Sequence, residues 1–307
     1  MNVWAVVVNW NGGAENLECL GSLAAAGLPA GRVVFVDNGS TDGSLELVRE
    51  QHPDVRVVAN RENRGYGHGS NQGIELALAN GAEGVFLVNN DLVLGPRMLD
   101  VLLEELATRP EAGIVGPRVV YKDRPATIWA AGGALTYRQN LSTLLGHGAP
   151  DGAGWRVTRR VDYVPGCAML VRRAVFEDVG LLDGAYFAYH EDVELCLQAN
   201  EAGWQTWVVG SASALHRAGG ATGGGYNARR KWMMGVNTIW FLRKHGTPTR
   251  WARFFLFDVL PLPALWLVAL FRGRGRAVLA KACGMWAGAR GRRVTAEALQ
   301  PGAGPFW

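Results

Sequence analysis

The first third of the chain repeats one pattern: a short apolar run, a polar turn and an amphipathic stretch. The apolar runs are rich in valine and cover residues 4–8, 33–36, 55–59 and 85–88. Runs of this kind are typical of buried strands. The stretches between them, at about 14–27, 45–51 and 70–80, have the character of helices. Alternating strands and helices predict a parallel sheet with right-handed crossovers, and therefore an α/β fold.

The fourth apolar run leads directly into Asn89, Asn90 and Asp91, and the following Gly95-Pro96 predicts the start of a helix. In open α/β sheets, ligands bind beyond the carboxyl ends of the strands. Asp91 offers a hard oxygen ligand that suits Mg²⁺ or Mn²⁺ bound together with a diphosphate. The competing interpretation is a polar loop whose Asp91 only caps the next helix.

Polar residues also follow the other predicted strands, and all these loops should meet at one edge of the sheet. Asp37 could accept a hydrogen bond from the imide N–H of a pyrimidine base, although for Asp37 taken alone an Asx-turn leading into the next helix is the simpler explanation. Asn63, Gly65 and Asn71 could place amide and backbone groups near a nucleotide, or they could be ordinary loop residues. Neither G-x-G-x-x-G nor a Walker A sequence occurs, so a nicotinamide or ATP site of the usual type is not expected.

Residues 113–165 are less regular. We expect loops at Trp129–Gly133 and at 146–154, where they could line an acceptor cleft, and a further strand over 164–171. Strand character returns over 204–209.

A helix with acidic residues in its first turn is predicted from Glu191 to Gly203. The helix dipole favours carboxylates there, which alone accounts for Glu191 and Asp192. A carboxylate held ionised is also what a general base for a sugar hydroxyl requires. His216 lies just beyond the strand at 204–209 and before a glycine-rich segment, 219–225, that we expect to be mobile. It could be a structural histidine or a ligand.

Charge divides the chain into two segments, 1–225 and 226–307. The second has 14 Lys or Arg against two acids, a net charge of +12, whereas the first has 17 basic and 25 acidic residues, a net charge of −8. Half of the 12 tryptophans lie in the second segment. No recognised nucleic-acid-binding motif accompanies this basic composition, so we expect no nucleic-acid partner.

The remaining composition indicates a cellular setting. The four cysteines are widely spaced without a C-x-x-C pair, which favours reduced thiols over zinc ligands or disulfides. Residues 1–4 enter the first predicted strand at once, so we expect no signal peptide. Both observations favour a cytoplasmic protein.

The basic tail contains an apolar stretch, residues 254–271, whose only charge is Asp258 and which arginines flank on both sides. Asp258 and two prolines make a straight membrane span a poor interpretation. Basic flanks with Trp and Phe on an apolar body suit an interfacial or re-entrant anchor on anionic lipid. A soluble helical subdomain or a homodimer interface is the alternative.

These motifs, taken in order, resemble family 2 of the glycosyltransferases, which have the GT-A nucleotide-sugar fold, a Rossmann-like, mostly parallel sheet with helices on both faces. The matching stretches are 8–12, 36–44, 63–67, 71–73, 89–91, the helix from Glu191 to Trp204, and His216. Each motif is weak alone, but the ordered set over residues 3–225 is specific. Within the family, the chain is most similar to the bacterial rhamnosyltransferase-like branch that builds cell-surface polysaccharides.

The resemblance implies roles for the candidate residues. Asp37 would contact the base, Asn9 and Asn11 would shape the base and ribose pocket, and Asp91 would bind the metal with His216 as a possible further ligand. Asp192 would be the catalytic base, supported by Glu191. The nucleotide-sugar-binding set is Asn9, Asn11, Asp37, Asn63, Gly65, Asn71, Asn89 and Asn90. Asn89 departs from the family pattern, because a D-x-D motif has its first Asp there.

The resemblance further implies an inverting, metal-dependent transfer of a sugar, with rhamnose the best guess. The donor would be a nucleoside-diphosphate sugar, and the acceptor a glycan or polyprenyl-linked glycan at the inner face of the cell membrane. Two other functions stay open: a nucleotidyltransferase that makes nucleotide sugars, and a non-catalytic module that binds sugar or membrane.

Overall fold

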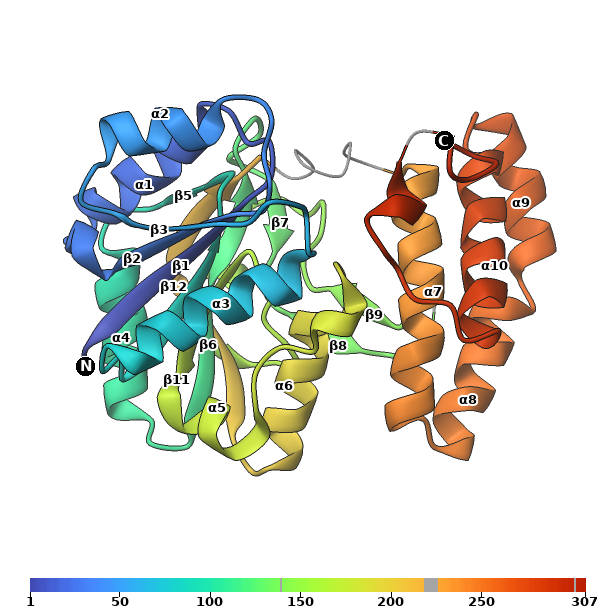
Figure 1. The fold of residues 1–307 in the computed structure, drawn as a ribbon. Helices are drawn as coiled ribbons and strands as arrows, with labels where there is room; N and C mark the ends of the chain where they lie inside the picture. Colours follow the sequence, from blue (N-terminus) through green and yellow to red (C-terminus); the bar gives the residue numbers. More distant parts are fainter. Residues whose placement is uncertain (139, 218–225, 301) are drawn as a thin grey trace.

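The computed structural model describes residues 1–138, 140–217, 226–300 and 302–307. A sheet domain and a group of helices stand side by side (Figure 1). The first part of the sheet domain comprises β1 (Val3–Asn9), α1 (Glu15–Ala25), β2 (Val33–Asp37), α2 (Ser44–Gln51), β3 (Arg56–Ala59), α3 (Tyr66–Ala79), β4 (Gly84–Asn89), β5 (Leu92–Leu94) and α4 (Met98–Thr108). The second part comprises β6 (Ala112–Tyr121), β7 (Ile128–Ala130), β8 (Gly133–Leu135), β9 (Ser142–Leu144), β10 (Arg159–Arg160), β11 (Ala168–Arg172), α5 (Arg173–Val179), α6 (Glu191–Glu201) and β12 (Gln205–His216).

The four predicted strands are neighbours in one sheet whose order is β10-β12-β6-β11-β4-β1-β2-β3. β4, β1, β2 and β3 are parallel, so the prediction of parallel strands ending at one edge is confirmed. β11 lies antiparallel between β4 and β6, which makes the sheet mixed. This insertion brings the segment before β11 to the edge where β1, β2 and β4 end.

Both faces of the sheet are buried, which explains why its strands are apolar throughout. Alternate residues of β1 point to opposite faces: Trp4 and Val6 join one apolar core, while Val3, Ala5 and Val7 join the other. Helix α3 packs on β1 and β2, and α4 packs on β12 and β6. The fold is therefore a three-layer α/β arrangement with its loops gathered at the strand ends.

Two local expectations were wrong. Trp129 lies in β7 and Gly133 begins β8, because short strands pair with β6 and β9 where glycine and alanine suggested loops. β12 continues past a register shift between Val209 and Ser213, so His216 is its last residue rather than lying beyond it. The helix expected after Gly95-Pro96 is present as α4, and a short strand that was not predicted, β5, precedes it. The glycine-rich segment 219–225 lies outside the described residues.

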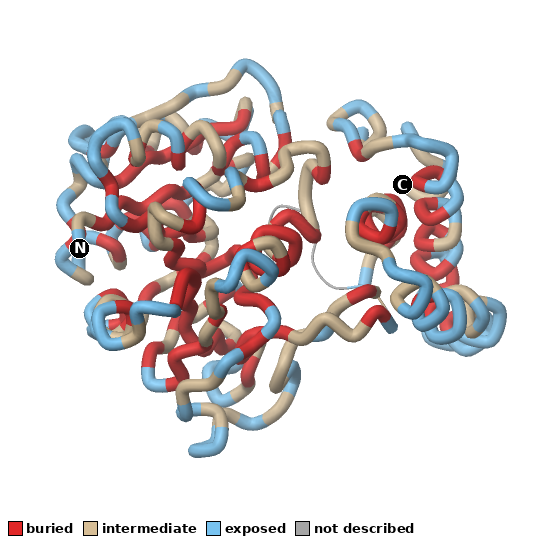
Figure 2. The backbone as a smooth tube through the Cα atoms, turned by 90° about the horizontal axis from the view of Figure 1, so that it is seen from below, coloured by how far each residue is buried: buried red, intermediate tan, exposed pale blue. Residues whose placement is uncertain are grey.

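The helical tail contains α7 (Ala228–His245), α8 (Pro248–Phe254), a π-helical turn at Phe255–Val259, α9 (Leu262–Phe271) and α10 (Gly275–Ala289). In the part of the chain described, the continuous segment Pro248–Phe271 is long and apolar enough to cross a membrane, and only 17% of its apolar 18-residue window is buried. Its outer surface is exposed and faces away from the sheet domain (Figure 2). Nine large apolar side chains are exposed there: Phe255, Leu256, Phe257, Leu260, Leu265, Leu267, Val268, Leu270 and Phe271.

Helix α7 packs against both the sheet domain and the rest of the helical tail. It packs closely along α10, and its residues Ile239, Phe241 and Leu242 lie in the same apolar core as Val193 and Leu197 of α6. Glu194 of α6 is 1% exposed and is paired with Lys244 and His245 of α7. The tail is thus anchored to the helix that carries the predicted base.

Candidate active site

The turn after β4 brings Asp91 to the end of β12. β5 pairs antiparallel with the last residues of β12, with Leu92 opposite His216. This register places His216 beside Asp91, with 3.0 Å between His216 Nε2 and Asp91 Oδ1. The structure therefore brings together the two residues predicted as metal ligands.

The Asp91–His216 pair fits a divalent cation. Both side chains are nearly buried, and apart from their mutual contact Asp91 Oδ1 and both ring nitrogens of His216 have no hydrogen-bond partner among the described residues. The ring of Trp129 packs edge-on against His216, with ring centroids 4.5 Å apart. No third His, Cys, Asp or Glu completes a cluster among the residues that the structure describes. Two protein ligands leave coordination positions for phosphate oxygens or water.

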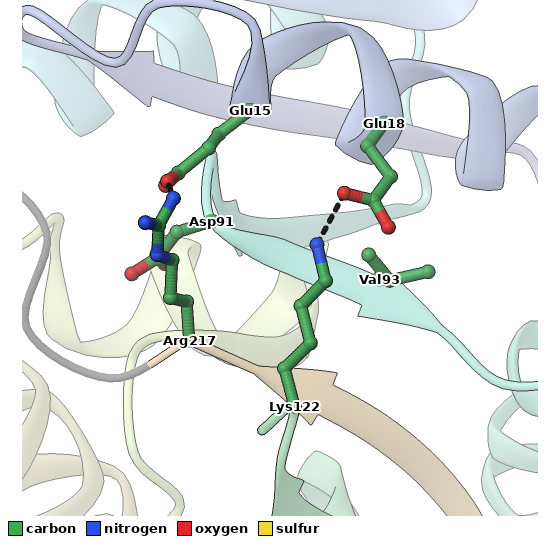
Figure 3. Close-up of a pocket in the computed structure, with 6 residues that line it drawn as sticks. All are labelled: Glu15, Glu18, Asp91, Val93, Lys122 and Arg217. Atoms are coloured by element: carbon green, nitrogen blue, oxygen red, sulfur yellow. Dashed lines mark hydrogen bonds and ion pairs between the residues drawn. The ribbon is translucent and has the colours of Figure 1, made fainter.

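A pocket opens beside Asp91 (Figure 3). It is lined by Glu15, Glu18, Asp91, Val93, Lys122 and Arg217. Arg217 is paired with Glu15, and Lys122 with Glu18, so α1 is bridged to the residues that follow β12 and β6. The approach to Asp91 is therefore polar, with its acidic and basic side chains paired.

At the other end of the site, Glu191 and Asp192 begin α6 in different environments. Glu191 is 5% exposed and its Oε2 has no hydrogen-bond partner in the described part of the chain, whereas Asp192 is only partly buried. Asp192 accepts hydrogen bonds of 2.8 Å from the amides of Gly166 and Val193. Asp192 is therefore the carboxylate that a substrate can reach.

Burial sets the protonation of this pair. It raises the pKa of Glu191 well above its usual value, and the adjacent Asp192 carboxylate raises it further. Burial also raises the pKa of Asp192, but the amides of Gly166 and Val193 oppose that rise by hydrogen-bonding to its charged form. The environments thus favour the neutral form of Glu191 more strongly than that of Asp192, whose charged form the two amides stabilise.

The segment before β11 joins the two ends of the site. Gly166 binds Asp192 through its amide, while the carbonyl of Cys167 accepts a hydrogen bond of 2.9 Å from the amide of Asn89. The Tyr66 hydroxyl donates to the Gly166 carbonyl at 2.8 Å. A Cβ on Gly166 would lie 3.2 Å from the Cβ of Asp192, so this close approach favours glycine. One short stretch of backbone therefore holds both the turn that carries Asp91 and the predicted base, Asp192.

The loop leading into Glu191 is strained. Phe187, Tyr189 and His190 have φ values of 63°, 73° and 81°, in the left-handed region that non-glycine residues rarely adopt. Such residues persist where surrounding contacts hold them, and they often occur at functional sites. The contacts that hold this loop should therefore matter to the position of Asp192.

Two adjacent residues of α7 supply such contacts. Asn237 is 1% exposed, and its Nδ2 donates to the carbonyls of Tyr186 (3.0 Å), Ala188 (2.8 Å) and Tyr189 (2.9 Å). The Thr238 hydroxyl lies 3.1 Å from Nε2 of His190, whose pKa burial lowers to about 3. No local pattern in the sequence indicates this clamp, because its partners are about 50 residues away.

Asn9 and Asp37 meet at the ends of β1 and β2. Both are almost completely buried, and Asn9 Nδ2 donates to Asp37 Oδ1 at 2.8 Å and to the Ser40 and Ser44 hydroxyls. Asp37 Oδ2 accepts from the Ser40 amide at 3.0 Å. The side chain of the more exposed Asn11 accepts from the Thr41 amide at 2.8 Å. These contacts shape the loop after β2, and the base-binding roles stay a prediction.

The other predicted nucleotide-binding residues lie near the same edge. Asn90 donates to Asn9 and Asn16, and Asn63 accepts from the Gly65 amide at 2.9 Å. Asn71 is engaged elsewhere, because its side chain both donates to and accepts from the backbone of Leu182.

Sequence reasoning missed several residues that support the site. Asn38 is buried and donates to the Gly65 carbonyl at 2.9 Å, joining the loops after β2 and β3. Tyr66 and Gly166 support Asp192 through the contacts of the segment before β11. Asn38 and Tyr66 lie inside the matching motifs, so their position beside motif residues was the available signal.

This combination defines a class. A mixed sheet with an acidic turn after β4 and a carboxylate at the start of a late helix is the arrangement of the GT-A glycosyltransferases. The computed structure resembles a mannosyltransferase from Pyrobaculum calidifontis in complex with GDP-Man and Mn²⁺, with a TM-score of 0.56 and 19% identity, over 97% of this chain and 78% of that one. It also resembles residues 1–349 of S. aureus TarS, with a TM-score of 0.55 and 14% identity, over 95% and 92% of the two chains.

The particular family follows from sequence comparison. The family model described as "Glycosyltransferase like family 2" matches residues 2–235, and the chain belongs to this family. It is 31% identical over 238 residues to the N-acetylglucosaminyl-diphospho-decaprenol L-rhamnosyltransferase of Mycobacterium tuberculosis, covering 71% of this chain and 76% of the relative. A low-salt glycan biosynthesis hexosyltransferase of Haloferax volcanii is 26% identical over 60% of this chain and 58% of its own.

These comparisons confirm the predicted family, the GT-A fold and the similarity to the rhamnosyltransferase branch. The protein is therefore a glycosyltransferase. The comparisons favour this activity over the two alternatives, a nucleotidyltransferase and a non-catalytic module.

Proposed function

We propose that this glycosyltransferase transfers a sugar, with rhamnose the best guess, from a nucleoside-diphosphate donor to a lipid-linked glycan, in a metal-dependent reaction that inverts the anomeric configuration. The observation that carries the proposal is the pairing of two sites on one backbone segment. The Asp91–His216 pair lies at one end and Asp192 at the other, and residues 166–167 contact both the turn and the base.

Asp91 and His216 would hold the divalent cation, Mg²⁺ or Mn²⁺. When bound, such a cation neutralises the charge that develops on the leaving nucleoside diphosphate. The Pyrobaculum calidifontis mannosyltransferase, which has a similar fold, is in complex with Mn²⁺, and this supports the choice of cofactor.

Asp192 would take the proton from the acceptor hydroxyl as that hydroxyl attacks the anomeric carbon. Its partial exposure lets the hydroxyl approach, and the amides of Gly166 and Val193 hold its oxygens in place. Glu191 is buried and would be neutral, so that it adds no second negative charge beside the reacting hydroxyl. A single displacement, in which one base activates the acceptor hydroxyl, inverts the anomeric configuration. The presence of one accessible carboxylate, Asp192, in addition to the turn that carries Asp91 supports that mechanism.

The nucleotide would lie over the ends of β1, β2 and β4. The buried Asn9–Asp37 network, with Asn11, Asn63, Gly65, Asn89 and Asn90 near it, supports this placement, and the base would be a pyrimidine. Asn71 is a weaker candidate because it binds Leu182. One relative is an N-acetylglucosaminyl-diphospho-decaprenol L-rhamnosyltransferase. Its name supports the proposal of a dTDP-rhamnose donor and a polyprenyl-linked acceptor for this chain.

The protein would work at the cytoplasmic face of the cell membrane, in the synthesis of cell-envelope polysaccharide. The exposed apolar side chains of Phe255–Phe271, flanked by arginines, suit insertion into the interface of an anionic bilayer. Asp258 is buried and paired with Lys281 of α10, so this segment packs on the tail instead of standing alone. In this arrangement residues 1–225 carry the donor site, and 226–307 form the membrane-proximal unit that also braces it through α7. A homodimer formed through the same apolar surface is the alternative.

The test is donor binding by calorimetry, with a panel of nucleoside-diphosphate sugars and Mn²⁺. Asp91→Asn should abolish the metal-dependent part of binding, and His216→Ala should weaken it less. Asp54→Asn, at an exposed position, is the matched control and should bind normally. Unchanged affinity of Asp91→Asn would contradict the metal assignment, and a purine-linked donor that binds best would contradict the proposed base.

A further inference from the structure

Basic side chains from two helices of the tail meet over one tyrosine. Lys231, near the start of α7, has its Nζ 4.4 Å from the ring centroid of Tyr226, and Arg274, just before α10, has its Cζ 5.7 Å from the same centroid. Next to Lys231, Arg230 lies over Tyr189, with 5.2 Å between its Cζ and the ring centroid. We refer to Arg230, Lys231 and Arg274 as the basic cluster.

Two members of the basic cluster, Lys231 and Arg274, form no ion pair with a carboxylate among the described residues. Lys231 is 7% exposed and donates to a neutral group, Oδ1 of Asn140, at 3.1 Å. Burial and the nearby charges of Lys281 and Arg230 lower the pKa of Lys231 to about 7. The carboxylate that acts on Lys231 is Asp258, which is already paired with Lys281. Cations crowded in this way would be stabilised by a bound anion.

The position of the basic cluster is between the predicted base and the apolar surface of the tail. Tyr189, under Arg230, is three residues before Asp192, a separation of at most roughly 11 Å along the chain. Arg274 is three residues after Phe271, the most exposed apolar side chain of α9 at 94%. The starts of α7 and α10 lie at the same end of the helical group (Figure 1).

We propose that the basic cluster binds the diphosphate of the lipid-linked acceptor. This inference rests on the proposed function and adds the place where the acceptor is recognised. Arginine and lysine side chains that converge on one site are the usual partners of phosphate oxygens. With the diphosphate held there, the attached sugar would extend toward Asp192, and the lipid chain would run along the exposed apolar side chains of α9.

Binding of farnesyl diphosphate to the full-length protein tests the site without turnover. EDTA would be present, so that a metal-bound diphosphate at Asp91 does not contribute. Farnesyl diphosphate should bind at least tenfold more tightly than farnesol, and Arg274→Gln and Arg230→Gln should each weaken it about tenfold, as for a lost charge-assisted hydrogen bond. Arg290→Gln is the matched control, because Arg290 follows the opposite end of α10 and stacks on Trp286.

Two results would overturn the proposal: equal binding of farnesol and farnesyl diphosphate, or equal losses in all three arginine variants, which would indicate general electrostatic attraction. Inorganic diphosphate and anionic phosphatidylglycerol vesicles distinguish the source of the phosphate. If either competes as well as farnesyl diphosphate, the basic cluster does not recognise the lipid-linked diphosphate.

Transfer assays separate this site from the proposed function. Two acceptors with the same sugar and lipid, one with a diphosphate and one with a neutral ether link, would be compared. Arg274→Gln should lower kcat/KM about tenfold on the diphosphate acceptor and leave the neutral acceptor unchanged. Equal losses on both acceptors would overturn the basic cluster as the recognition site. Selective binding without transfer to either acceptor would instead contradict the proposed function.

Discussion

Replacing Asn237 with leucine removes the clamp on the loop that leads into the catalytic carboxylates while keeping a side chain of similar size. Asn237 lies on α7, outside the stretch of motifs, and its Nδ2 contacts three carbonyls of residues 186–189. The loop contains three non-glycine residues with positive φ. Each such residue costs about 1–3 kcal/mol, so the loop holds its shape only while these contacts persist.

The size of the effect follows from the hydrogen-bond count. An amide group has two hydrogens, so the three contacts amount to about two full hydrogen bonds. Leaving two buried carbonyls unsatisfied costs about 1–3 kcal/mol each, or about 2–6 kcal/mol if the loop stays in place. Relaxation of the strained residues would recover part of this cost. We therefore expect a loss of about 2–4 kcal/mol in the free energy of unfolding, together with displacement of Asp192.

Urea unfolding and steady-state kinetics would be measured on the same preparation. For Asn237→Leu we expect kcat to fall at least tenfold while donor affinity is retained, because Asp91 and His216 belong to other elements. Thr238→Val should give a smaller loss of both stability and kcat, since it removes one contact, to His190. Normal kcat in a destabilised Asn237→Leu protein would refute the idea that the clamp positions the base.

Asp192→Asn should bind donor normally and lose about 10²–10⁴-fold in turnover, the usual range for a general base. Glu191→Gln should keep most activity, because burial favours the neutral form of Glu191. The reverse order of losses would make Glu191 the base. The acid limb of kcat/KM should lie above the usual aspartate pKa of about 3.9, because burial raises the pKa of Asp192. The raised pKa values also affect stability. A carboxyl group whose pKa is raised in the folded state stabilises the protein at low pH, and this contribution is lost as pH rises through that pKa. Both variants should therefore melt at a higher temperature than the wild type at neutral pH and lose that advantage in acid. The double variant Leu260→Gln, Phe271→Ser should reduce binding to anionic vesicles roughly tenfold or more. The control Val157→Ser, at an exposed position on the sheet domain, should not reduce it. Unchanged vesicle binding together with a changed oligomeric state would indicate a dimer interface.

The sequence predicted the parts of the site that local patterns encode. Valine-rich runs ending in Asp37 and Asp91 predict parallel strands, and parallel strands necessarily bring their following loops to one edge. Asp91 and His216, which were predicted as ligands of one metal, also lie together, although the sequence placed His216 after the strand. The Gly210-Ser211 stretch interrupts the apolar pattern, but β12 continues across it with a shift of register.

Contacts between distant segments could not be predicted in this way. β11 inserts antiparallel beside β4, and this brings Gly166 to Asp192, yet nothing in residues 164–171 specifies a direction. Asp258 was an argument against a membrane span, whereas in the structure it forms a buried pair with Lys281, 23 residues later. In both cases the partner is set by the tertiary fold, and neither partner has a local signature.

The most direct test of the proposed reaction is the structure of its product. The full-length protein would be incubated with dTDP-rhamnose, Mn²⁺ and a lipid-diphosphate-linked N-acetylglucosamine, and the anomeric configuration of the transferred sugar determined from its one-bond carbon–proton coupling by NMR. We predict a product of inverted configuration whose formation stops on removal of the metal with EDTA and resumes when Mn²⁺ is restored. Retained configuration, or transfer that continues at full rate in EDTA, would contradict a metal-dependent single displacement with Asp192 as the base.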